Sequence, residues 1–81
     1  MTDSAIAARL VNALESAADR EAGGKTALVS VEITMLARAD AGQIVAHLTR
    51  KTRSLVFLNA EFTTDAGERI ANAMSVHKIL S

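Results

Sequence analysis

Few side chains in this sequence have the neighbours that catalysis or metal binding requires. His47 and His77 have no cysteine, aspartate or glutamate at the spacing of metal ligands, so we expect no metal site. We interpret both as partly exposed polar residues of strands. Ser16, Ser30 and Ser75 lack the G-x-S-x-G setting of a serine nucleophile, and no glycine loop could cradle a phosphate.

The only concentration of like charge is the basic cluster Arg50, Lys51 and Arg53. Three cations this close together could bind an anion, either as point charges or as bidentate forks. A solvated hairpin tip that binds no ligand explains the same residues. The cluster alone therefore leaves both interpretations open.

The composition bounds the class of protein. The 81 residues make one domain with a small core. Because the sequence has no cysteine, no disulfide can stabilise this core, and we expect association with further copies. The net charge is zero and tyrosine and tryptophan are absent, which argues against a nucleic-acid partner. No apolar run is long enough to cross a membrane, and no signal sequence is evident, so we expect a cytoplasmic protein.

A helix is expected over about residues 4–21. Its apolar residues recur at helical spacing, namely Ile6, Leu10, Ala13, Leu14, Ala17 and Ala18. Thr2, Asp3 or Ser4 can cap the start, and Gly23-Gly24 can end the helix in a left-handed conformation. Because this stripe is rich in alanine, the helix can pack closely on a sheet.

After the glycines the apolar period changes to two, which predicts four strands within about residues 28–80. The strands are Val29 to Leu36, Ile44 to Thr49, Leu55 to Phe62, and about Arg69 to Leu80. In the first strand the residues expected to face the core are Val29, Val31, Ile33 and Met35. Short turns join the last three strands into a meander, the last turn being Asp65-Ala66-Gly67. The predicted fold class is α+β, one long helix packed on a four-stranded antiparallel sheet.

The strands carry apolar residues on both faces, as Leu55 and Phe57 beside Val56 and Leu58 show. One helix covers only one face of a sheet. Scattered exposed apolar residues would explain the other face. A subunit interface explains it better, and we expect a homodimer or larger homo-oligomer.

Three segments resemble small hot-dog thioesterases of the phenylacetate-pathway and 4-hydroxybenzoyl-CoA type. Val29–Arg38 with Ala39-Asp-Ala-Gly42 resembles their second strand and the turn that follows it. Thr49–Phe62 is similar to their third-to-fourth strand hairpin, and Asp65-Ala-Gly67 with Arg69–Ala73 to their last turn and strand. The resemblance covers about residues 28–80, and the helix precedes it as the family's central helix does.

The resemblance implies the hot-dog fold, with the first strand beside the last. The family has a further N-terminal strand and a His-Gly-Gly turn before the helix. Neither is present in this sequence, so residues 1–81 would form a single truncated hot-dog domain. We expect segment 29–35 to pair with its copy across a dimer axis, and segment 44–49 to lie at a bare sheet edge.

The family's catalytic carboxylate lies in the middle of the central helix. The resemblance places Glu15 there as general base or nucleophile, with Ser16 as the alternative if the register differs by one. A solvated residue on the polar face of the helix is the interpretation without catalysis. In related thioesterases, basic residues near strand ends contact the phosphates of coenzyme A. The resemblance implies that role for Arg50, Lys51 and Arg53.

Two functions from different classes follow. The first is an acyl-CoA thioesterase, in which a helix carboxylate activates water and coenzyme A is part of the substrate. The second is a non-catalytic hot-dog module that dimerises or binds an acyl or CoA-like ligand. Neither needs a separate cofactor.

Overall fold

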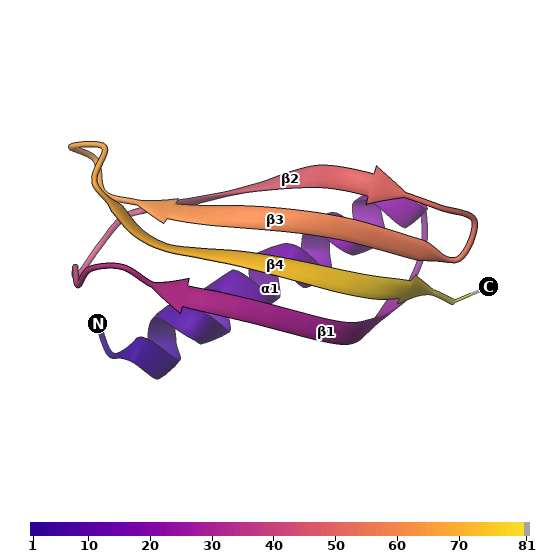
Figure 1. Ribbon diagram of the computed structural model, residues 1–81, viewed down its shortest axis with the longest axis horizontal. Coiled ribbons are helices and arrows are strands. Elements are labelled where there is room, and N and C mark those ends of the chain that lie inside the picture. The colour runs from indigo at the N-terminus through magenta and orange to yellow at the C-terminus, as the bar shows by residue number, and fades with distance from the viewer. Residues whose placement is uncertain (81) are drawn as a thin grey trace.

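The computed structural model describes residues 1–80 as one helix and four strands (Figure 1). The elements are α1 (Asp3–Ala22), β1 (Thr26–Met35), β2 (Gln43–Lys51), β3 (Leu55–Thr63) and β4 (Arg69–Ile79). The strands form one antiparallel sheet in the order β1-β4-β3-β2. Helix α1 lies across one face, here called the inner face, and the opposite outer face carries no helix. The predicted fold class and strand order are confirmed.

Helix α1 begins and ends at residues suited to those places. The side-chain oxygen of Thr2 accepts a hydrogen bond from the backbone N–H of Ala5 at 3.1 Å, so Thr2 is the N-cap. Gly23 has φ of +71°. Its N–H donates to the carbonyl of Arg20, and the N–H of Gly24 donates to the carbonyl of Asp19. The helix therefore stops where the two glycines predict.

The core lies between α1 and the inner face of β3 and β4. From the helix it takes Ile6, Leu10, Leu14, Ala17 and Ala18, and from the sheet Val56, Leu58, Ala60, Phe62, Ile70, Ala71 and Ala73. Many of these side chains are alanine, which allows helix and sheet to approach closely. The Arg9 guanidinium covers one side of the Phe62 ring, 5.0 Å from its centroid.

The predicted inner residues of β1 are partly wrong. Val31 and Ile33 pack against the core as expected. The pairing of β1 with β4 shifts between Leu28 and Ser30, so Val29 is the extra residue of a β-bulge and its side chain is 59% exposed. Met35, at the other end, is 38% exposed. The alternation of apolar and polar residues in the sequence continues through the bulge, whereas the pairing of β1 with β4 shifts by one residue there.

The connections between strands are short. β2 continues to Lys51, two residues beyond its predicted end, with its own pairing shift between Leu48 and Arg50. Gly67 has φ of +90° and its N–H donates to the carbonyl of Thr64, as expected for the last turn.

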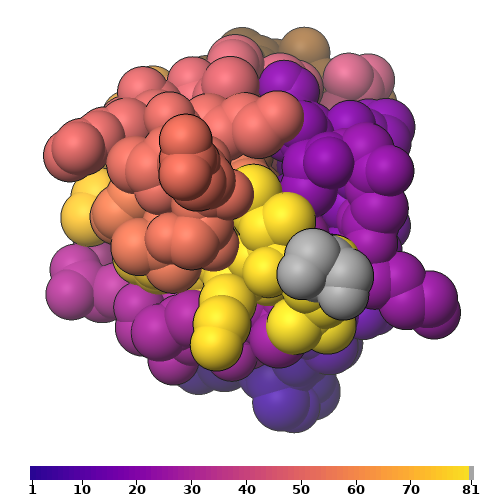
Figure 2. All heavy atoms as spheres, turned by 90° about the vertical axis from the view of Figure 1, so that its right-hand side faces the viewer, coloured from indigo at the N-terminus to yellow at the C-terminus, as the bar shows by residue number. Residues whose placement is uncertain are grey.

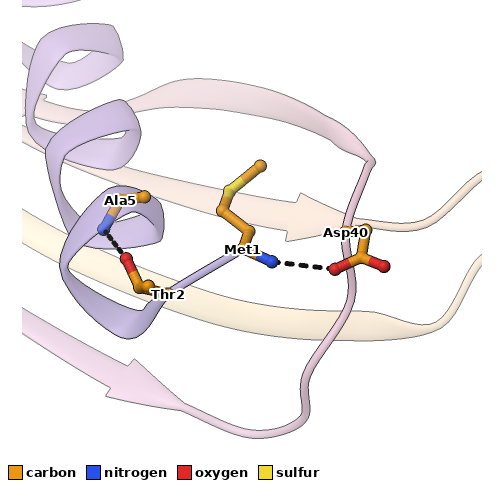
Figure 3. Close-up of polar contacts among 4 residues, drawn as sticks. All are labelled: Met1, Thr2, Ala5 and Asp40. Atoms are coloured by element: carbon orange, nitrogen blue, oxygen red, sulfur yellow. Dashed lines mark hydrogen bonds and ion pairs between the residues drawn. The ribbon is translucent and has the colours of Figure 1, made fainter.

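Polar contacts link the start of α1 to the connection between β1 and β2. The amino group of Met1 donates to the carboxylate of Asp40 at 2.8 Å (Figure 3). That hydrogen bond, together with the positive charge, lowers the pKa of Asp40 below its usual 3.8. Arg38 and Asp3 form a second, looser pair at 3.6 Å. Within residues 1–80, no helix is long and apolar enough to cross a membrane.

Candidate functional site

Glu15 is an exposed residue of α1. Its neighbour Leu14 is buried, whereas Glu15 and Ser16 are both exposed. An exposed carboxylate can reach water or a ligand, and it can equally remain solvated. One turn later, Asp19 is already engaged, because its carboxylate accepts hydrogen bonds from the N–H of Thr26 at 3.0 Å and from the Thr26 hydroxyl at 2.7 Å. Of Glu15 and Asp19, Glu15 is therefore the freer carboxylate.

The basic cluster does not converge on one point. Arg50 is on the outer face, where its guanidinium lies 5.7 Å from the centroid of the Phe57 ring. Lys51 is the next strand residue and points to the opposite face, where its ammonium donates to the carbonyl of Glu21 at 2.7 Å. Arg53 lies in the turn between β2 and β3 and is exposed. Figure 2 views the molecule from the end that carries this turn, beside the end of β4.

Lys51 thus has a role that sequence reasoning missed. Its ammonium reaches one of the last carbonyls of α1, which no residue of the helix can satisfy. A cation is also favoured at the C-terminus of a helix by the helix dipole. The signal in the sequence was weak, because 30 residues separate the two partners.

The expected exposure of His77 is wrong. The residue is 0% exposed and lies on the inner face of β4, in phase with the core residues Ala71 and Ala73. Its Nε2 is 2.7 Å from the hydroxyl oxygen of Ser75, which is buried as well. Its Nδ1 is buried without a hydrogen-bond partner. The period of two along β4 could have found this, since it places His77 on the same face as the alanines.

Burial shifts the titration of this imidazole. Removal from water lowers the pKa of His77 below its usual 6.5, and the negative charges of Glu15 and Asp19 oppose part of that shift. His47, in contrast, is exposed on β2. Among residues 1–80 no group of three histidine, cysteine, aspartate or glutamate side chains could hold a metal ion.

The outer face of the sheet is hollowed above β4. The larger hollow has a volume of about 380 Å³ and its walls include Phe57, Met74 and Val76. Asn59 lies between this hollow and a smaller neighbour, and its side-chain oxygen is buried without a hydrogen-bond partner. Glu15 is on the helix, on the other side of the sheet. The hollow and the helix carboxylate therefore belong to different surfaces.

Comparison with solved structures shows the fold. The chain is similar to the BH2602 protein from Bacillus halodurans, whose crystal structure was determined with CoA, at a TM-score of 0.89 and 16% sequence identity. The match covers 100% of this chain and 56% of that one, so the chain spans little more than half the length of the structure it matches. The arrangement of one helix on a four-stranded antiparallel sheet is the hot-dog fold. No protein-family model matches the sequence, and no curated protein matches it.

Proposed function

We propose that this protein is a hot-dog domain that binds acyl-CoA thioesters and hydrolyses them. The similarity to a structure determined with CoA, over the whole chain, is the observation that carries this proposal. The sequence resemblance to hot-dog thioesterases of the phenylacetate-pathway and 4-hydroxybenzoyl-CoA type points to the same chemistry.

In this proposal Glu15 is the general base. Its carboxylate takes a proton from a water molecule while the water oxygen bonds to the thioester carbonyl carbon. The carbon–sulfur bond then breaks, and the proton passes to the departing thiolate of coenzyme A. The exposed position of Glu15 in the second half of α1 supports this role, because it leaves the carboxylate accessible to water.

Release of free thiol from a panel of short, aromatic and long acyl-CoA esters tests the hydrolysis. A positioned general base typically contributes about 10²–10⁴-fold to the rate. We expect Glu15→Gln to lose a factor in that range, with the same fold and melting temperature. Glu68→Gln is the matched control, since Glu68 is exposed in the turn between β3 and β4. Equal rates for Glu15→Gln and Glu68→Gln would remove Glu15 from the mechanism.

We also propose that the basic cluster contacts the phosphates of coenzyme A. Arg53 is exposed in the turn, and Arg50 is held by its ring contact beside it. Lys51 can contribute only by leaving the carbonyl of Glu21. Replacing all three by glutamine should abolish the binding of coenzyme A in calorimetry.

Single substitutions distinguish the contributions of the three cations to binding and to stability. One charge-assisted hydrogen bond contributes about 1.5–3 kcal/mol, so loss of Arg53 should weaken binding about tenfold or more. Lys51→Gln should mainly reduce the stability of the fold. Arg38→Gln removes the same charge from an exposed site near the opposite end of α1 and should bind normally. Unchanged affinity in the triple variant would show that the cluster does not bind coenzyme A.

A second candidate is a non-catalytic hot-dog module that binds an acyl or CoA-like ligand. The burial of Ser75 and His77 favours it, because neither side chain can reach a substrate and Glu15 is left without a catalytic companion among the candidates. Binding of coenzyme A without thiol release from any ester would select this function.

The proposed partner is a second copy of the chain, joined through segment 29–35 of β1. Within residues 1–80, β1 pairs only with β4, so one edge of the strand has unpaired backbone groups. A two-fold axis would let two such edges satisfy each other in a continuous sheet. Because Val29 belongs to the bulge, the regular part of that contact would be residues 30–35.

A further inference from the structure

We infer that the buried pair of Ser75 and His77 makes the contact between α1 and the sheet acid-sensitive. The two side chains lie on the inner face of β4, on the surface that α1 covers, and their polar atoms are 2.7 Å apart. Uptake of one proton by His77 is then linked to opening of the helix–sheet core. This inference is independent of the proposed binding of coenzyme A.

The hydrogen-bond geometry disfavours a protonated His77 in the closed fold. A neutral imidazole can use Nε2 toward the Ser75 hydroxyl and keep one unpaired nitrogen. A protonated imidazole carries N–H groups on both nitrogens. Its Nδ1–H would be a donor with no acceptor, on a buried cation. Both consequences favour any state in which water reaches the ring.

No charged side chain lies directly opposite His77 in the sheet. The cross-strand partners of His77 are Leu28 on β1 and Val56 on β3, both apolar. The charged groups that act on the ring, Glu15 and Asp19, are both on α1, and both side chains are exposed. Asp19 is already hydrogen-bonded to Thr26. These carboxylates reduce the effect of burial but do not reverse it.

The direction of the pH dependence follows from linkage. The imidazole loses its proton more readily in the folded protein than in the unfolded chain, so the unfolded chain binds more protons below pH 6.5. The contribution of His77 to stability is therefore complete above that pH, and it is lost as the pH drops toward the lower pKa of the folded state. Within this window each drop of one pH unit raises the unfolding equilibrium constant by up to about tenfold. The contribution of Asp40 is lost separately, only below about pH 3.8.

Two histidine variants test the inference in urea unfolding followed by circular dichroism between pH 5 and 8. We expect the wild-type protein to lose stability below pH 6.5, His77→Gln to lose this dependence, and His47→Gln to keep it. His47 is the matched control because it is exposed on β2. The same acid loss in His77→Gln as in the wild type would overturn the inference.

Titration of the two imidazoles by NMR decides the question even if His77→Gln does not fold. The spectrum of His47→Gln identifies the His77 resonance in the wild-type protein. We expect that resonance to titrate below 6.5, or to stay neutral until the domain unfolds. Titration of His77 at or above 6.5 in the folded protein would overturn the inference.

Discussion

Truncation of Leu14 to alanine should remove most of the stability of this domain. Leu14 is 1% exposed and lies in the core between α1 and the sheet. The same core contains the small side chains of Ala17, Ala18, Ala60 and Ala73. Alanine has no rotamer through which it could fill a gap, so the space left by the leucine should persist.

The magnitude follows from the chemistry of the lost atoms. Removing three buried carbons loses about 0.8 kcal/mol each in transfer free energy, and a cavity that does not collapse adds to this. We therefore expect a loss of about 3–5 kcal/mol, in the upper part of the usual range for leucine to alanine. A domain of 81 residues typically has about 4–12 kcal/mol in total, so the variant should be close to unfolding.

Urea unfolding at a fixed protein concentration measures this loss, since association would make stability depend on concentration. Leu36→Ala is the matched control, because Leu36 follows β1 in a connection and is 52% exposed. We expect the control to lose less than about 1 kcal/mol. If Leu14→Ala loses no more than Leu36→Ala, the assignment of α1 to the core is refuted.

Two further predictions concern single residues, and a third concerns assembly. Gly42→Ala should be destabilising by more than about 1 kcal/mol in urea unfolding, because its Cβ would overlap the Phe62 ring and the carbonyl of Thr63. Gly24→Ala, which has open space around it, should cost less. Lys51→Met should reduce stability by about 0.5–2 kcal/mol through loss of the hydrogen bond to Glu21, and Lys51→Arg should recover part of it. Sedimentation equilibrium at micromolar concentration should show a dimer or larger species, and a folded 8.5 kDa monomer would contradict the proposed pairing through β1.

Local sequence patterns predicted the helix and the strands because each pattern depends on residues that are close together in the sequence. The stripe from Ile6 to Ala18 and the two glycines place α1 to within a residue at either end. The alternation from Val56 to Phe62 matches the inner face of β3, although the sequence did not decide between this face and the one that carries Leu55 and Phe57. In both cases one period governs every residue of the element.

Contacts between distant segments could not be predicted in the same way. The bulge at Val29 depends on how β1 pairs with β4, and the alternation of apolar residues gives no sign of it. The bond from Lys51 to Glu21 joins the end of β2 to the end of α1, so the basic cluster could not be divided before the fold was known. For the candidate site, sequence resemblance selected Glu15, and only the structure showed that its side chain is exposed.

The buried histidine shares its face of β4 with alanines of the core. Alanines on α1 at 17 and 18, and on the strands at 60, 71 and 73, allow close packing of helix and sheet. On the inner face of β4, His77 is as fully buried as Ala71 and Ala73. Burial and the unpaired Nδ1 make this imidazole costly to protonate. A domain built this way gains its packing at neutral pH and loses part of that stability in acid.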